Sequence, residues 1–427
     1  QTACEGSSAS FTANAGGTGL IYQWQLSTDG GANWNNIAGA NSSNYSISNV
    51  SFSQNGHRFR CVINNGVCAT PGISNAAILT VNQLAAINTQ PTSATICSGS
   101  SNSFCVTATG TGLTYQWQIS TNGCSGPWTN IAGATSNCYS VVGTSTAYYR
   151  CNVTSGACGN TVSSNCSTLT VINPPTITNH PANVQVCSGS NAVFNVSGSS
   201  TQTVIYQWQV SSDGGTTWNN MSGANASTLT VTGTAVSMNN NRYRCQLSNA
   251  TCATPVNSGA AILTVRQLPS VGLTAAPLTS LLPGQTTTLT ATPSTSTGGT
   301  LSTAWTYNTN PLAVAGNTYV VNVEKTGNYQ VGISEAWPGG LVCANASPVV
   351  TINAPASSRL FIFPSPNDGR FSVSYYNAGG NNTQRQIMIY DAKGAAVYSR
   401  KFSIAGPYTL LNIDLRQANT GIYFVVV

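Results

Sequence analysis

The alternation of apolar and polar residues along the chain predicts β-strands nearly everywhere. Near the N-terminus, apolar side chains recur at about every second position in short runs, which is the period of a strand with one buried face. These runs are residues 10–15, 20–27, 44–50, 57–64 and 76–81. Glycine, asparagine, serine and aspartate separate the runs, and no stretch keeps the period of a helix. Short strands joined by polar turns are typical of a β-sandwich.

The same pattern is repeated along the chain. The stretch YQWQLSTDGGANW at 22–34 returns in altered form at 115–128 and at 206–218. The first tryptophans of these stretches, 93 and then 91 residues apart, are Trp24, Trp117 and Trp208. A period of about 90 residues is too long for a solenoid repeat or a propeller blade and matches a small all-β domain.

Each repeat carries a phenylalanine before its tryptophan and an aromatic-x-Cys motif after it. The phenylalanines are Phe11, Phe104 and Phe194, and the motifs begin at Phe59, Tyr149 and Tyr243. This arrangement resembles the immunoglobulin-like domain, which has a buried tryptophan on strand C and an aromatic residue before the cysteine of strand F. The resemblance implies a two-sheet sandwich. Phenylalanine stands where an immunoglobulin domain has its strand-B cysteine, so the usual inter-sheet disulfide cannot form there.

Fourteen cysteines indicate an oxidising, extracellular setting. Each repeat has a Cys-x-Gly cysteine, a strand-F cysteine and a third cysteine seven residues later. These trios are Cys4, Cys61 and Cys68; Cys97, Cys151 and Cys158; and Cys187, Cys245 and Cys252. The second repeat adds Cys105, Cys124, Cys138 and Cys166, and Cys343 follows alone.

The odd count in each trio leaves two pairings open. In the first, the Cys-x-Gly cysteine pairs within its own repeat and the remaining cysteine is a buried thiol, so each repeat holds at least one internal disulfide. In the second, the leftover thiols bridge neighbouring domains or subunits. Within the second repeat, Cys105 faces outward on strand B and Cys138 precedes the inward Tyr139 on strand E. A bridge between Cys105 and Cys138 is therefore geometrically feasible.

Charged residues are scarce, which narrows the chemistry that the chain can perform. They make up only 5% of the chain, against roughly 25% in a typical globular protein. The net charge of +6 is spread along the chain, with no dense basic patch of the kind that binds nucleic acid. No apolar run approaches the ~20 residues of a membrane span. His57 and His180 are isolated and no C-x2-C pair exists, so we expect no metal and no cofactor.

One motif nevertheless resembles part of an enzyme. Ser27-x-Asp29-x-Gly31-x-x-Trp34 has the spacing of the Asp-box found in sialidases. A glycosidase needs two carboxylates about 5 to 9.5 Å apart, but the first repeat offers only Glu5 and Asp29, on opposite sides of strand B, and the second repeat has no acid. One carboxylate is also too few for calcium. We therefore expect a hairpin turn, no catalytic residue and no enzyme.

The last segment carries three ordered motifs, LFIFPSPNDGRFSVSY, IMIYDAKGAAVYSRKF and LNIDLRQANTGIYFVVV. They resemble the C-terminal sorting domain of type IX secretion cargo in the Bacteroidota, which has P-N-P-x-x-G-x-F near its start and GIYFV near its end. The matching residues are Pro364, Pro366, Gly369, Phe371, Gly421 and Tyr423, with Ser365 in place of the asparagine. The resemblance implies contact with the type IX machinery, export across the outer membrane, and an extracellular or outer cell-surface location.

Together these patterns predict an all-β chain of tandem immunoglobulin-like β-sandwiches in a rod, followed by a C-terminal β-sandwich of the sorting type. The expected domains are 1–82, 83–173 (rich in cysteine), 174–267, 268–354 and 355–427. The fourth is a divergent immunoglobulin-like domain with Trp305 on a C-like strand and Tyr329 on an F-like strand.

The two terminal domains suggest how copies of the chain associate. The first repeat starts too close to its Cys-x-Gly motif to supply the A-strand that its sister repeats have. The sorting family usually continues beyond GIYFVVV with a further strand. An unpaired sheet edge at each terminus favours pairing with another chain. Two function classes follow: a head-to-tail homopolymer forming a surface or secreted filament or stalk, or an adhesin whose loops bind a glycan or protein.

Overall fold

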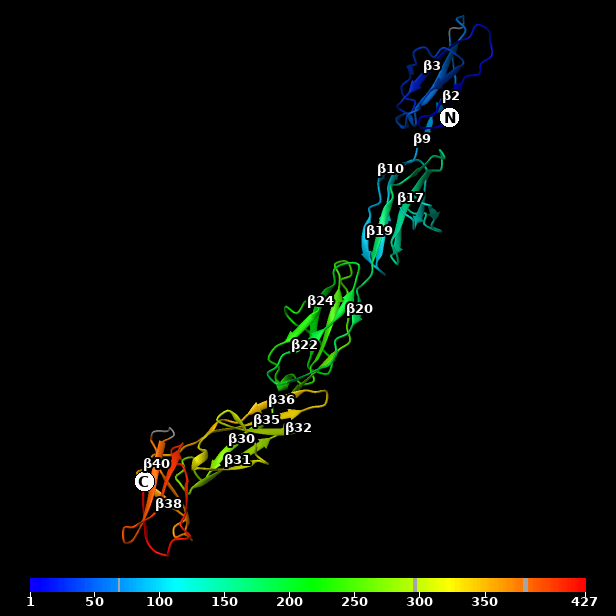
Figure 1. The fold of residues 1–427 in the computed structure, drawn as a ribbon. Helices are drawn as coiled ribbons and strands as arrows, with labels where there is room; N and C mark the ends of the chain where they lie inside the picture. Colours follow the sequence, from blue (N-terminus) through cyan, green and yellow to red (C-terminus); the bar gives the residue numbers. More distant parts are fainter. Residues whose placement is uncertain (68–69, 295–297, 379–382) are drawn as a thin grey trace. The chain divides into compact units, whose positions relative to one another are not determined.

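A computed structural model describes residues 1–67, 70–294, 298–378 and 383–427 (Figure 1). Within these residues all regular structure is β-strand, apart from three short 3-10 turns. These turns are Phe52–Gln54, Val236–Met238 and Val323–Lys325. The predicted all-β class is therefore confirmed. The described chain contains no helix long and apolar enough to cross a membrane.

The chain divides into two compact units. The first consists of Gln1–Asn179, Ser197–Tyr206 and Gln246–Asn257. The second consists of His180–Val196, Gln207–Cys245 and Ser258–Val427.

The first repeat is a sandwich of short strands. They are β1 (Thr2–Cys4), β2 (Ala9–Thr12), β3 (Ile21–Ser27), β4 (Asn35–Asn36), β5 (Asn44–Ile47), β6 (Arg58–Asn64), β7 (Gly72–Ile73), β8 (Ala77–Ile78) and β9 (Thr80–Asn82). One layer pairs β2 with β5, and the other has the order β4-β3-β6-β7 with β8 also on β6. Strand β1 runs parallel to β9. Alternate residues of β2 are buried, as the two-residue period of the sequence requires.

The second repeat has the same plan with one addition. Its strands are β10 (Ala86–Thr89), β11 (Ala94–Cys97), β12 (Ser101–Cys105), β13 (Thr107–Thr109), β14 (Leu113–Ser120), β15 (Thr129–Asn130), β16 (Cys138–Val142), β17 (Ala147–Ser155), β18 (Thr161–Ser163) and β19 (Ser167–Ile172). The layers are β12-β16 and β11-β19-β17-β14-β15, with β18 also on β17. The addition is a two-stranded pair of β10 with β13, which has no counterpart among the described residues of the first repeat.

The third repeat follows the second strand for strand. Its strands are β20 (Thr176–Asn179), β21 (Val184–Cys187), β22 (Ala192–Asn195), β23 (Ser197–Ser199), β24 (Ile205–Ser211), β25 (Asn219–Asn220), β26 (Thr228–Val231), β27 (Arg242–Ser248), β28 (Val256–Asn257) and β29 (Ala261–Arg266). Here β20 pairs with β23, β22 with β26, and a sheet has the order β21-β29-β27-β24-β25.

The core of each repeat is built around its tryptophan. Trp24, Trp117 and Trp208 are all buried. Each indole Nε1 donates to a backbone carbonyl eighteen or nineteen residues later, at 2.9, 3.0 and 2.9 Å. Because a buried indole N–H without a partner is costly, this bond lets a large aromatic side chain fill the core without an orphaned donor.

The fourth domain is a sandwich of two sheets. Its strands are β30 (Ser270–Ala276), β31 (Thr286–Ser294), β32 (Thr300–Tyr307), β33 (Asn310–Leu312), β34 (Thr318–Asn322), β35 (Gly327–Ala336), β36 (Val342–Ala346) and β37 (Val350–Ile352). The sheets have the orders β30-β31-β34 and β33-β32-β35-β36, with β37 also on β35. Trp305 lies on β32 and Tyr329 on β35, and both are buried between the sheets.

The C-terminal domain consists of two three-stranded sheets. Its strands are β38 (Leu360–Phe363), β39 (Arg370–Tyr375), β40 (Thr383–Asp391), β41 (Ala396–Ile404), β42 (Leu411–Asp414) and β43 (Tyr423–Val426). The sheets have the orders β38-β39-β42 and β41-β40-β43. Phe371 and Val373 from one sheet meet Ile387 and Ile389 from the other in a small core.

The C-terminal domain packs on the fourth domain through Tyr408. This side chain is 1% exposed and belongs to the core cluster of the fourth domain. Its ring lies 5.8 Å from the ring of Phe361 and 5.5 Å from that of Tyr376. Its hydroxyl donates to the carbonyl of Pro355 at 2.9 Å. The segment between the two domains is therefore bridged by a buried aromatic contact.

Candidate functional site

The Asp29 carboxylate is occupied by hydrogen bonds within its own turn. It accepts from the Ser27 hydroxyl at 2.7 Å, from the Asn33 backbone N–H at 2.9 Å and from the Asn33 side-chain amide at 2.7 Å. These bonds lower the pKa of Asp29 to about 2, the Asn33 backbone bond contributing most. Gly30 and Gly31 both have positive φ, at 77° and 99°, which lets the chain reverse. The structure thus shows Asp29 as part of a turn, as the sequence predicted.

The third repeat builds the same turn around Asp213. Its carboxylate accepts from the Ser211 and Thr217 hydroxyls at 2.7 and 2.6 Å, and these bonds and the Thr217 N–H lower its pKa. In the second repeat Asn122 takes the place of the aspartate, and its backbone N–H donates to the Ser120 hydroxyl at 3.2 Å. The second repeat therefore closes the corresponding turn without a carboxylate at this position.

The tryptophan that closes each turn lies under an arginine. The Arg60 guanidinium is 4.2 Å from the Trp34 ring centre, and the sister pairs Arg150 on Trp128 and Arg244 on Trp218 are at 4.5 and 4.2 Å. The Nε of Arg60 donates to Gln25 on the neighbouring strand at 2.8 Å. Each of these arginines therefore holds its turn on the sheet by a cation–π contact.

Three disulfides join successive domains. They are Cys4–Cys158, Cys97–Cys252 and Cys187–Cys343, with sequence separations of 154, 155 and 156 residues. In each, the Cys-x-Gly cysteine of one domain is bonded to a cysteine that follows the F-strand of the next domain. Both cysteines of every bond lie within the same compact unit.

This pairing corrects the expectation that each repeat holds an internal disulfide. Cys4, Cys97 and Cys187 lie beside Asn82, Ile172 and Arg266 in parallel register, at the last strand of their own repeat. Each is therefore close to the start of the following domain. Internal pairing with the strand-F cysteine is wrong because that thiol points into the core, opposite the tryptophan. Cys68 lies outside the described residues.

Only the second repeat has internal disulfides among the described residues. Cys105–Cys138 joins β12 to β16, where the two residues are directly opposite each other, and this is the bridge that the sequence allowed. Cys124–Cys166 connects the turn after β14 to the segment before β19. The turn with Asn122 in place of aspartate is thus the one that a disulfide fastens.

The strand-F cysteines remain buried thiols. Cys61, Cys151 and Cys245 are 0% exposed. Burial raises the pKa of all three thiols, and to about 11 for Cys151 and Cys245. A buried thiol with a raised pKa is a poor nucleophile and a poor metal ligand. The described residues also contain no group of three or more His, Cys, Asp or Glu side chains that could hold a metal ion.

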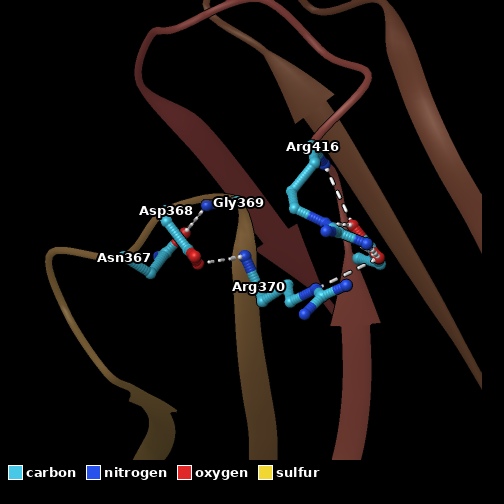
Figure 2. A network of polar contacts seen from close by, with 6 residues as sticks. Asn367, Asp368, Gly369, Arg370 and Arg416 are labelled. Atoms are coloured by element: carbon cyan, nitrogen blue, oxygen red, sulfur yellow. Dashed lines mark hydrogen bonds and ion pairs between the residues drawn. The ribbon is translucent and has the colours of Figure 1, made fainter.

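The sorting motif forms a tight corner between β38 and β39 (Figure 2). Gly369 has a φ of 96°, and a Cβ there would lie 3.0 Å from the Arg416 backbone, so this position requires glycine. Its N–H donates to Asn367 at 2.9 Å, and the Arg370 N–H donates to Asp368 at 3.1 Å.

An exposed acid and two arginines close this corner. The Asp414 carboxylate lies 3.5 Å from the Arg370 Nε and 2.7 Å from an Arg416 nitrogen (Figure 2). Hydrogen bonds from Arg416 lower the pKa of Asp414. The other motif residues are placed apart from the corner: Phe371 is buried in the core, and the Tyr423 hydroxyl donates to the Asn419 carbonyl just ahead of Gly421.

The structure identifies three cysteines whose partners were not predicted from the sequence. Cys343 is the partner of Cys187, and Cys124 and Cys166 form a pair. The constant separation of about 155 residues between Cys4 and Cys158, and again between Cys97 and Cys252, could have located Cys343. No comparable regularity points to Cys124 and Cys166, because the other repeats lack both residues.

Comparison with known proteins adds family information. Residues 1–83, 86–173 and 176–267 each match the family described as "Domain of unknown function (DUF8696)". Residues 361–427 match the family described as "Secretion system C-terminal sorting domain". The protein is therefore exported by type IX secretion to the cell surface or the extracellular space.

Likeness to individual proteins is more limited. A segment of 169 residues is 32% identical to Endoglucanase C of Cellulomonas fimi, covering 38% of this chain and 15% of the length of that relative. The titin I-band fragment I67–I69 is 15% identical, with 64% of this chain and 99% of the fragment covered and a TM-score of 0.40. The N-terminal eight Ig domains of DSCAM are also 15% identical, with coverage of 100% and 58% and a TM-score of 0.34.

The three tandem matches together span more than half of the chain. The chain therefore belongs to the DUF8696 domain family, as three consecutive immunoglobulin-like members that are followed by a secretion-system sorting domain.

Proposed function

We propose that the protein is a non-enzymatic structural subunit of a surface or secreted filament or stalk, assembled head to tail from copies of itself. The observation that carries this proposal is the series of inter-domain disulfides. Every junction from the first repeat to the fourth domain is crossed by one such bond, Cys4–Cys158, Cys97–Cys252 or Cys187–Cys343. A catalytic or ligand-binding domain can function without covalent bonds to its neighbours. In a structural subunit such bonds keep consecutive domains connected under load.

Among the described residues, the acids and thiols that could have reacted are occupied or buried, which supports the non-enzymatic part of the proposal. Asp29 and Asp213, the acids of the Asp-box motif, use their oxygens to close turns. The strand-F thiols are buried with raised pKa values. These residues are fully engaged in holding the fold.

In the proposed assembly, the sorting-type domain of one copy contacts the first immunoglobulin-like domain of the next. Low charge supports this contact, because little repulsion opposes the packing of identical subunits. Such a head-to-tail contact produces an open filament unless its rotation closes a ring.

Electron microscopy and light scattering test this proposal. Intact protein at high concentration should form polymers, whereas a variant lacking residues 359–427 should remain folded and monomeric. Because that deletion uncovers the surface on which Tyr408 packs, an intact chain with Tyr408→Phe serves as a control that keeps the domain in place. An intact protein that stays monomeric at high concentration would rule out the filament.

The second candidate is an adhesin that binds a surface glycan or protein through its loops. The observation that favours it is the 32% identity to a segment of a protein named an endoglucanase. A pull-down of the intact protein on insoluble β-glucan, with serum albumin as the non-binding control, distinguishes the two. Saturable retention on the glucan by a monomeric protein would favour the adhesin.

A further inference from the structure

The core of the fourth domain includes a side chain that the fourth domain does not supply. Tyr408 lies between β41 and β42 of the C-terminal domain, yet its ring belongs to the same buried cluster as Leu281 and Trp305. Phe361 and Tyr376, also from the C-terminal domain, pack against that cluster. Both domains lie within the second compact unit. Because interfaces between consecutive domains are usually more polar and permit motion, this shared aromatic core indicates a fixed contact.

Two further contacts join the C-terminal domain to the fourth domain. The Leu410 N–H, which lies just ahead of β42, donates to the Glu324 carboxylate at 2.9 Å. The Phe363 ring, on β38, packs on the bare backbone of Gly284, where an added Cβ would lie 3.8 Å from the ring. These contacts come from separate parts of the C-terminal domain. Together with Tyr408 they restrict rotation of one domain against the other.

The linker between the two domains, residues 353–359, is held at both ends and in between. At its start, Asn353 donates its N–H to the backbone of the fourth domain at 2.8 Å and accepts from that backbone at 2.9 Å. The Pro355 carbonyl then accepts from the Tyr408 hydroxyl at 2.9 Å. Directly after the linker, Leu360 is paired with β39. A protease cuts readily in loose, exposed loops, and this short, tethered segment is not one of them.

We propose that the C-terminal domain has a second role besides sorting: it completes the core of the fourth domain, closes the linker to proteases and stays attached after export. Sorting is needed only during export, whereas these contacts act for as long as the protein is folded. Without the C-terminal domain, the fourth domain would keep its two sheets but lose stability, because the place of Tyr408 in its core would be open. The inference goes beyond the proposed filament and does not depend on polymer formation.

Limited proteolysis of the intact protein tests the closed linker. Arg359 is exposed and precedes Leu360, so trypsin can cut this bond only when the linker opens. The wild type should resist cutting at Arg359, and Tyr408→Ala should be cut there about tenfold faster or more, because its docked state is destabilised. Tyr408→Phe keeps the ring in the core and should show a smaller increase. Mass spectrometry detects the fragment that begins at Leu360, and rapid cutting of the wild type there would overturn the proposal.

A second variant weakens the contact from the side of the fourth domain. Glu324→Ala removes the acceptor of the Leu410 N–H and leaves the sequence of the C-terminal domain unchanged. It should therefore also speed the cut at Arg359. Glu324→Gln is the matched control, because its amide oxygen can still accept from Leu410. Equal cutting of the alanine and glutamine variants, at the rate of the wild type, would show that this bond does not hold the linker.

Hydrogen exchange shows whether the fourth domain depends on the contact. In Tyr408→Ala the amides of β31 and β35, whose buried residues belong to the same cluster as Tyr408, should exchange faster than in the wild type. The amides of β39 and β40, which form the separate core of the C-terminal domain, should keep their protection. Unchanged exchange in β31 and β35 would overturn the proposed second role.

Cutting the linker deliberately separates this inference from the filament proposal. A site for a specific protease, inserted between Ala356 and Ser357, lets the full chain fold before it is cut. Residues 357–427 should then remain bound to the rest of the protein on size exclusion, and Tyr408→Ala should release them. Release from the wild type would overturn the second role, whatever the polymer state. A fragment that remains bound in a protein that is monomeric at high concentration would support it while ruling out the filament.

Discussion

At the scale of single residues, the Asp turn shows a carboxylate used for backbone geometry. We expect Asp29→Asn to lower the melting temperature of the first repeat by a few degrees at most, because Asn33 and Ser27 can still donate to the amide oxygen. Asn122 fills the same position in the second repeat, which supports tolerance of the change. Differential scanning calorimetry measures the effect, with Asp213→Asn as a parallel in the third repeat.

The difference in stability between the wild type and Asp29→Asn should depend on pH in a definite direction. The pKa of Asp29 falls from the ordinary 3.8 to about 2 on folding, so its carboxylate stabilises the fold above pH 3.8 and loses that effect as the pH falls through about 2. The gap between wild type and Asp29→Asn should therefore be full at pH 7 and closed below pH 2. A gap that is independent of pH would contradict this assignment, as would a hydrolytic activity lost in a folded variant.

The strand-F thiols give a second test at this scale. With a pKa of about 11, Cys151 and Cys245 are on the order of 0.1% ionised at pH 8, and both are inaccessible. Iodoacetamide should leave Cys61, Cys151 and Cys245 unmodified in the native protein and label them in denaturant. Peptide mapping without reductant reads each site, and native labelling of Cys151 would show that the core opens.

At the scale of elements, the sequence predicts the strands well because each one has a buried and an exposed face. The alternation in residues 57–64, for example, corresponds to the buried Phe59 and Cys61 of β6. The sequence did not reveal that Ala13 and Gly72 take the places of Val106 and Val162 of the second repeat, because both residues fit the strand pattern and only the pairing of the strands identifies their counterparts. Local periodicity reports burial along a strand and carries no information on the volume between strands.

The cysteines show a similar limit. The sequence left two disulfide pairings open, within a repeat or between repeats, because three cysteines per repeat are compatible with either. What decides between them is the parallel register of β1 with β9, which moves Cys4 to the end of its domain. That register comes from a contact between residues far apart in the chain, and no local pattern encodes it.

The disulfide between the second and third repeats can be tested by cutting the chain. A protease site inserted at residues 173–175 should yield two fragments that stay together without reductant, because Cys97–Cys252 spans the cut. Reductant should release them. The double variant Cys97→Ser, Cys252→Ser should separate under both conditions on a denaturing gel. Separation of the wild-type fragments without reductant would contradict the bond.

At the scale of the whole molecule, Tyr408 couples the C-terminal domain to the fourth domain. Tyr408→Ala should cost about 3 kcal/mol or more, because it removes a large buried side chain from a shared core. Tyr408→Phe should cost about 1 kcal/mol, since it loses only the bond to Pro355. Denaturant unfolding gives both values. An alanine variant as stable as the phenylalanine variant would mean that the domains unfold independently.

The inter-domain disulfides also set how far the chain can be stretched. Between Cys4 and Cys343 the backbone has 339 steps, or roughly 1,200 Å when fully extended. With the disulfides closed, the shortest covalent path crosses from Cys4 to Cys158, follows 29 residues to Cys187 and crosses to Cys343, which is about 100 Å. Under a pulling force, even complete unfolding of the domains between them could not separate Cys4 and Cys343 of the oxidised chain by much more than this distance. The segment from Cys4 to Cys343 is therefore nearly inextensible when its disulfides are closed and highly extensible when they are reduced.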